Sequence, residues 1–211
     1  DLKRIDICAL DIKSGTPKVL IEERMNTYVE VRRPGLVNEG KQIVHWSERD
    51  GWGHFYLYDE NGKQISQLTS GPWHAEDIEG IDDKTRTLYF TGNGKEAGED
   101  PYYLHLYRIG LDGSGLRVLN PGDAENSVSV DDANRYFVNT ASRVNSIPQS
   151  SIFDINGKKI MDLEKTDMTR MFEAGYKFPQ TVKVKADDGI TDLYGVMYKP
   201  FDFDSTKKYP V

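Results

Sequence analysis

The sequence predicts an all-β fold: a partial β-propeller of about three and a half four-stranded blades, followed by a β-hairpin. Two observations carry this prediction. Short β-branched and aromatic runs alternate with glycine-rich turns along most of the chain. Four segments also align with one another, each closing on a leucine, at a period of 44 to 51 residues that is typical of a four-stranded blade. The closing leucines are Leu20, Leu68, Leu119 and Leu163.

The clearest blade lies between Gln42 and Leu68. It contains two β-branched and aromatic runs, at residues 43–46 and 55–58, with a glycine-containing reversal between them. A second turn carries Asn61 and Gly62, which tolerate the positive φ angles of a tight hairpin. Residues 64–68 then alternate between polar and apolar side chains, as expected of a half-buried outer strand.

Three complete blades and one partial blade are predicted, with strands given from the innermost outwards. The first comprises residues 28–32, 43–46, 55–58 and 64–68; the second, 75–81, 88–91, 104–109 and 116–119; the third, 127–130, 136–139, 151–154 and 159–163. Residues 4–10 and 18–21 supply only the outer half of a further blade. Since a propeller ring is stable when its last blade meets its first, we expect the chain to be part of a larger propeller, or its open ends to pair with a second copy.

The blade period stops after Leu163. Residues 165–175 have the composition of a linker or short helix that ends at Gly175. Two alternating strands around a turn at residues 187–189 follow, and residues 207–211 resemble the start of a buried strand. The predicted organisation is therefore a propeller domain over residues 1–164, a connection over 165–175 and a second, truncated domain over 176–211.

Composition limits the classes of function. The 211 residues include 27 basic and 34 acidic side chains, a formal net charge of −7, and no Lys- or Arg-rich run, so nucleic acid is not an expected partner. No apolar run approaches the roughly 20 residues of a membrane span. Cys8 is the only cysteine, which excludes an internal disulfide and a cysteine zinc site but leaves the cellular compartment open.

Most side chains that could carry chemistry have a structural interpretation. The four histidines lie in or beside strands without a second ligand or nucleophile at usable spacing, and the acidic pairs fall mostly at turns and lack the spaced calcium pattern. We therefore expect no metal and no cofactor. The histidines are His45, His54, His74 and His105, and the acidic pairs are Glu76-Asp77, Asp82-Asp83, Glu99-Asp100, Asp131-Asp132 and Asp187-Asp188.

The aromatic residues allow two interpretations: a peptide-binding surface or filling of the wedges between blades, which we favour. They are Trp46, Trp52, Trp73, Tyr56, Tyr58, Tyr102, Tyr103 and Tyr107. The long insertion at residues 92–103 is the best candidate for a functional rim loop, for example a subunit contact.

Several strings carry a resemblance to a known family. WSERDGWGHFYLYD (46–59), LTSGPWH (68–74) and IEGID (78–82) resemble the propeller of the dipeptidyl peptidase IV family in the prolyl oligopeptidase clan. YGVMYKPFDFD (194–204) followed by STKKYPV (205–211) looks like the family's passage from the propeller into the α/β-hydrolase domain. The resemblance covers essentially the whole chain.

The resemblance implies a serine exopeptidase that removes dipeptides from N-termini with proline or alanine in the second position. Its nucleophile would lie in a Gly-x-Ser-x-Gly elbow, which this sequence lacks, so no catalytic residue is expected here. The family's oxyanion-stabilising tyrosine would follow Val211, and its paired glutamates would precede Asp1, so Glu22-Glu23 is not that pair. Arg33 matches an arginine before proline that borders the family's substrate pocket, whereas Arg32 stands where a family member has an aromatic residue.

These expectations lead to two hypotheses. In the first, the chain is a fragment of such a peptidase that gates and shapes access for peptide substrates and works with the missing blades and the hydrolase domain. Family habit implies a homodimer that is exported, to the periplasm in a bacterial source. In the second, the chain belongs to a non-catalytic propeller that binds a peptide or a protein. A sugar- or metal-binding propeller is a weaker third reading, because the sequence offers no ligand cluster.

Overall fold

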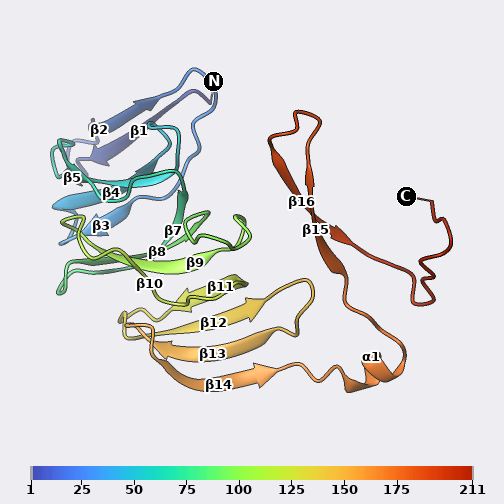
Figure 1. The fold of residues 1–211 in the computed structure, drawn as a ribbon. Coiled ribbons are helices and arrows are strands. Elements are labelled where there is room, and N and C mark those ends of the chain that lie inside the picture. Colours follow the sequence, from blue (N-terminus) through green and yellow to red (C-terminus); the bar gives the residue numbers. More distant parts are fainter. Residues whose placement is uncertain (1, 211) are drawn as a thin grey trace.

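The computed structural model describes residues 2–210 and confirms an all-β partial propeller followed by a hairpin. Three four-stranded antiparallel sheets and the two-stranded sheet β1–β2 stack in chain order, and they do not close into a ring (Figure 1). We refer to the four-stranded sheets as blades one, two and three.

Each blade follows the chain from one edge of its sheet to the other. The bounds are β1 Arg4–Leu10 and β2 Pro17–Arg24; β3 Gly35–Val37, β4 Gln42–Ser47, β5 His54–Asp59 and β6 Gln64–Gln67 in blade one; β7 His74–Asp82, β8 Thr87–Asn93, β9 His105–Gly110 and β10 Arg117–Val118 in blade two; and β11 Glu125–Val130, β12 Tyr136–Ser142, β13 Gln149–Asp154 and β14 Lys159–Lys165 in blade three. Blade two approaches blade one through contacts of β7 with β3 and β5, and blade three approaches blade two through contacts of β11 with β7 and β9.

The prediction that residues 28–32 form the innermost strand of blade one is wrong. The structure forms β3 only from Gly35 onwards, with Gly35 opposite Val44 and Val37 opposite Gln42. The preceding residue is Pro34, which has no amide hydrogen to donate to a neighbouring strand, so the ladder ends there. Residues 25–34 are consequently irregular, although residues 28–32 have strand-like composition.

Buried side chains fill the wedges between sheets. One cluster joins blades one and two, another joins β2 to blade one, and a third joins blades two and three. Of the aromatic residues singled out in the sequence, those buried in these wedges are Trp46, Trp73, Tyr56, Tyr58 and Tyr107, whereas Trp52 and Tyr102 are exposed. The prediction that aromatic residues fill the wedges between blades is therefore confirmed for these five buried residues.

A polar seam crosses the junction between blades two and three. The Asn120 amide nitrogen donates to Asn139 Oδ1 (2.8 Å), and the Asn139 amide nitrogen donates to Asn126 Oδ1 (2.9 Å). Asn126 in turn donates to the Leu104 carbonyl (2.7 Å). All three asparagines are buried, so these bonds replace the hydrogen bonds to water that burial removed.

The repeated turn glycine has a packing role as well as a conformational one. Gly62, Gly113 and Gly157 occupy the same turn in blades one, two and three, at φ angles of 85°, 82° and 84°. Each faces the carbonyl of the leucine that closes the preceding repeat: Leu20, Leu68 and Leu119, respectively. A Cβ added at Gly62 would overlap the Leu20 carbonyl, whereas one at Gly113 would stay 3.7 Å from the nearest backbone atom.

The part after blade three contains one short helix and one hairpin. The helix α1 spans Thr169–Glu173, within the segment 165–175 where the sequence predicts a linker or short helix, and β15 (Gln180–Lys185) pairs with β16 (Asp192–Met197). Residues 207–210 form no strand, contrary to expectation, and Val211 lies outside the described residues. No helix among residues 2–210 has the length and apolar character of a membrane span.

We predict that Gly62→Ala destabilises the chain more than Gly113→Ala. Both substitutions impose a positive φ on alanine, which costs about 1–2 kcal/mol, but only Gly62→Ala also forces a Cβ into backbone, for about 1–3 kcal/mol more. Urea denaturation of the two variants measures the difference. Equal losses of stability in the two variants would show that Gly62 is needed only for its positive φ angle and not for the close approach to the Leu20 carbonyl.

Candidate functional site: a pocket between blades one and two

A pocket of about 770 Å³ lies between β7 of blade two and the segment that leads into β3. Ile78 and Ile81 form part of its β7 wall, and Gly35 lies at the start of β3. A Cβ added at Gly35 would come within 2.5 Å of the Ile81 Cδ1 atom and 3.0 Å of the Ile78 Cδ1 atom. A glycine at this position therefore lets the two blades approach closely beside the pocket.

Arg32 crosses from one blade to the other. Its guanidinium bonds Glu76 of β7 (Nη2 to Oε2, 2.6 Å), Asp77 of β7 (Nη1 to Oδ1, 3.1 Å) and Glu30 (Nε to Oε1, 2.9 Å). It also lies 4.3 Å from the ring centre of Trp46, whose indole N–H donates to the Ala75 carbonyl (2.7 Å). The arginine thus ties β4 of blade one to β7 of blade two.

The charge of Arg32 is strongly favoured. Burial alone would lower its pKa, since its side chain is only 18% exposed, but the carboxylates of Glu76, Glu30 and Asp77 outweigh burial and raise the pKa above its ordinary value. Because three carboxylates and an aromatic face already surround it, this cation has little capacity left for a ligand.

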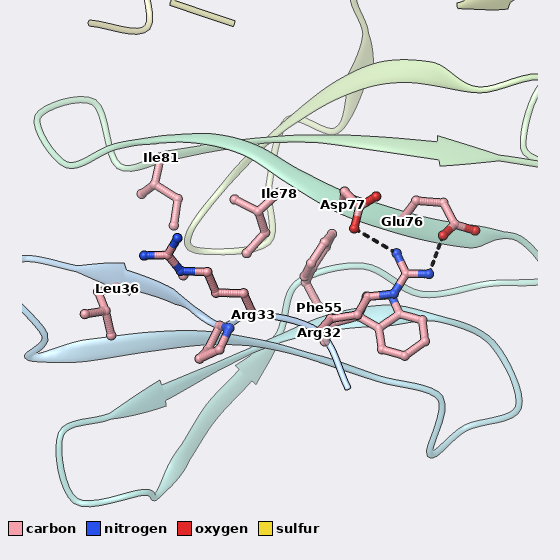
Figure 2. Close-up of a pocket in the computed structure, with 11 residues that line it drawn as sticks. Arg32, Arg33, Leu36, Phe55, Glu76, Asp77, Ile78 and Ile81 are labelled. Atoms are coloured by element: carbon pink, nitrogen blue, oxygen red, sulfur yellow. Dashed lines mark hydrogen bonds and ion pairs between the residues drawn. The ribbon is translucent and has the colours of Figure 1, made fainter. Parts of the chain in front are cut away.

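Arg33 has the opposite environment. Its side chain is exposed, and among residues 2–210 its guanidinium makes no ion pair or side-chain hydrogen bond. Figure 2 shows the Arg32 guanidinium between Glu76 and Asp77, while the Arg33 side chain extends away from these carboxylates, towards Ile81 and Leu36. Of these two adjacent arginines, Arg32 therefore has a structural role, and Arg33 has a free guanidinium. The role of Arg33 in binding substrate stays a prediction.

A second cluster, which sequence reasoning missed, combines a serine, a histidine and a carboxylate. His45 Nε2 lies 2.7 Å from Glu23 Oε2, Ser47 Oγ donates to Glu23 Oε1, and Arg49 Nη2 lies 3.7 Å from Glu23 Oε2. Glu23, His45 and Ser47 are buried. Burial alone would raise the pKa of Glu23, but the hydrogen bonds from His45 and Ser47 outweigh it and lower the pKa.

This cluster does not have the geometry of a catalytic triad. The serine and the histidine both bond the carboxylate, whereas a nucleophile must bond its general base. The alternation of β2 also places Glu22 on the opposite, exposed face, where it pairs with Arg4 and Arg24. The sequence signal for Glu23 was its two-residue spacing from the buried Ile21, which marks an inward position.

The other buried histidines are hydrogen-bonded too. His54 is fully buried, with Nε2 3.0 Å from the Gly71 carbonyl and Nδ1 3.0 Å from Thr69 Oγ1. This arrangement suits a neutral ring that donates to Gly71 and accepts from Thr69, and burial lowers its pKa. Within residues 2–210, no group of three or more His, Cys, Asp or Glu side chains is arranged to hold a metal ion.

Stacked four-stranded blades with a pocket beside their inner strands define the chain as a segment of a β-propeller protein. A family model described as "Dipeptidyl peptidase IV (DPP IV) N-terminal region" matches residues 1–148. The chain belongs to the dipeptidyl peptidase IV family. The resemblance seen in the sequence is confirmed.

Individual relatives agree with this assignment. Dipeptidyl peptidase 4 of Arthroderma otae is 28% identical over 187 residues, which cover 84% of this chain and 23% of that protein. Dipeptidyl peptidase 4 of Trichophyton rubrum is 25% identical over 222 residues, covering 99% of this chain and 28% of that protein. The crystal structure of Porphyromonas gingivalis dipeptidyl peptidase 4 superposes with a TM-score of 0.82 at 25% identity and covers 99% of this chain and 29% of that one. The chain thus spans about a quarter of the length of these relatives.

We predict that Arg32→Ala lowers the free energy of unfolding by about 1–3 kcal/mol, because it removes the stacking on Trp46 and leaves Glu76 partly buried without its cation. Arg32→Lys should recover only part of the loss, since an ammonium cannot bond several carboxylates in the same fork geometry. Urea denaturation measures both. Arg135→Ala is the matched control: that side chain is 71% exposed and we expect a change under about 0.5 kcal/mol.

We also predict that stability falls as the pH drops below about 6.5, the ordinary pKa of histidine. The pKa of His54 is lower in the folded chain, so the unfolded chain binds more protons between the two values and is favoured there, by up to about 1.4 kcal/mol per pH unit. Denaturation at pH 7.5 and 5.5 should show a smaller pH difference for His54→Gln than for the unaltered chain. His74→Gln removes a weak charge repulsion that also lowers the pKa of His54, but leaves the burial of that ring intact, so it should retain most of the difference. If the difference in stability between pH 7.5 and 5.5 is the same in His54→Gln as in the unaltered chain, His54 is not the group responsible for it.

Proposed function

We propose that this chain is the part of a serine exopeptidase that walls and gates the active site of an enzyme releasing Xaa-Pro or Xaa-Ala dipeptides from peptide N-termini. The relatives with which it aligns are dipeptidyl peptidases. The chain itself carries no Gly-x-Ser-x-Gly elbow, so the nucleophile, acid and base belong to a hydrolase domain outside these residues.

The observation that carries the proposal is the free cation of Arg33 beside the fully engaged cation of Arg32, at a pocket lined by inner residues of two blades. A guanidinium without an internal partner offers several N–H donors to the carbonyls or carboxylate of a peptide. The pocket walls are largely apolar, with Leu36, Ile78 and Ile81 beside Arg33, which suits an extended peptide with apolar side chains.

The remaining parts of the proposal rest on family membership. We infer that the enzyme acts as an exported homodimer, in the periplasm if the source is bacterial, and that its substrates reach the active site past the propeller. Since propeller blades are rigid, they would admit thin, unfolded N-termini and exclude folded proteins.

We predict that the full-length protein containing this chain cleaves Gly-Pro and Ala-Pro chromogenic dipeptides and is inhibited by a serine-directed organofluorophosphate. In that protein, Arg33→Ala should raise KM about tenfold, the loss of a hydrogen bond to a charged group, with kcat nearly unchanged. The isolated 211 residues should cleave nothing.

Arg135→Ala, at an exposed arginine of blade three, is the control and should leave both kinetic constants unchanged. If Arg33→Ala leaves cleavage unaffected, the protein is a peptidase as proposed, but Arg33 does not bind its substrate. Peptide binding without cleavage by the full-length protein would instead favour a non-catalytic binding propeller.

A further inference from the structure

The loop between β8 and β9, residues 94–104, which we call the rim loop, is fixed to blade two. Glu96 accepts a hydrogen bond from the Tyr107 hydroxyl (2.9 Å), and Glu99 Oε2 lies 2.8 Å from His105 Nε2. Tyr107 and His105 are buried members of β9. Because each anchor joins a loop carboxylate to a buried side chain of β9, the loop holds a defined position although it lies at the surface.

The rim loop projects from the side of the blades that faces the hairpin β15–β16 (Figure 1). Near the β9 end of this loop, the ring of Tyr102 meets the ring of Tyr194 of β16 edge to face, with centroids 6.0 Å apart and an interplanar angle of 82°. This is a favourable arrangement of two aromatic rings. Tyr102 is still 69% exposed with this contact in place, and Tyr194 is the one aromatic ring that it meets within residues 2–210.

A cavity of about 410 Å³ lies beside this contact and is lined from both sides. The rim loop supplies Asp100 and Tyr103, and the hairpin supplies Lys183, so opposite charges face the same space. Arg143, which follows β12 of blade three, also lines it, pairs with Asp123 (2.8 Å) and lies 6.0 Å from the Tyr103 ring centre. The cavity therefore marks a shared boundary between the blades and the hairpin.

The hairpin has little else to hold it in place. Its two strands pair with each other, and across the described chain no propeller strand packs against either of them. Nearly all of its side chains are exposed. A two-stranded hairpin is marginally stable on its own, so a contact outside the hairpin is needed to fix its position.

We propose that the rim loop is the docking element that holds the hairpin β15–β16 against the propeller, through the contact of Tyr102 with Tyr194. The partner of this surface is therefore the hairpin of the same chain. The inference goes beyond the proposed peptidase function and stands whether or not the full-length protein is an enzyme. Its consequence is that blade two, and not only the covalent connection after blade three, sets where the second part of the chain lies.

Hydrogen–deuterium exchange on the full-length protein that contains these 211 residues tests the proposal. Tyr102→Ala should accelerate amide exchange in residues 180–185 and 192–197 about 2- to 10-fold, the range expected for one aromatic pair. Tyr102→Phe keeps the ring and should exchange like the unaltered chain. Tyr194→Ala also removes the packing of Lys183 on this ring, so it should have a larger effect, but adding Tyr102→Ala to it should then change nothing further.

Tyr136→Ala, at a similarly exposed tyrosine of blade three, is the control and should not affect the hairpin. The proposal is overturned if the hairpin is unprotected in the unaltered chain, if Tyr102→Ala leaves its exchange unchanged, or if the effects of Tyr102→Ala and Tyr194→Ala are additive. Tenfold dilution should leave the rates unchanged. An effect of Tyr102→Ala that disappears on dilution would mean that the loop contacts a second copy and would also overturn the proposal.

Discussion

Burial between successive blades is the constraint on which this structure depends. A blade has two faces, and each is covered only by its neighbour, so the buried clusters lie between sheets and not within them. The spacing of the blades is set by backbone: turn glycines of one blade face the closing-leucine carbonyls of the preceding one. The asparagine seam adds a directional requirement, because a displacement of blade three against blade two would leave buried amides without partners.

The pocket follows from the same constraint. Where blades one and two meet, Arg32 is bound from both sides, by Trp46 of β4 and by Glu76 and Asp77 of β7. An arginine at that position acts as part of the core, although its charge would suggest a surface residue. Its neighbour Arg33 has no such partners, so its guanidinium is available to a ligand, and ordering its flexible side chain on binding would cost about 0.5–1.5 kcal/mol.

Most of the fold could be predicted from the sequence because strand composition, turn glycines and period agree at every repeat. The error at residues 28–32 arose because strand-like composition was given more weight than Pro34. The site was less predictable. Arg33 was predicted through family resemblance, and its role stays a prediction. The different environments of Arg32 and Arg33, the Glu23–His45 pair and the contact of Tyr102 with Tyr194 all depend on blade packing or on residues at least 20 positions apart. Local sequence patterns do not contain that information.

The proline before β3 has an evolutionary consequence. By ending the ladder at Gly35, Pro34 leaves the preceding residues outside the hydrogen-bonded sheet, next to a pocket but with their amides uncommitted to any strand. Substitutions at the position of Arg33 should therefore leave the packing of the blades intact, whereas those at Arg32 remove a contact between blades one and two. The fold thus tolerates change unequally at two adjacent arginine codons, because only one of the two side chains holds blades together.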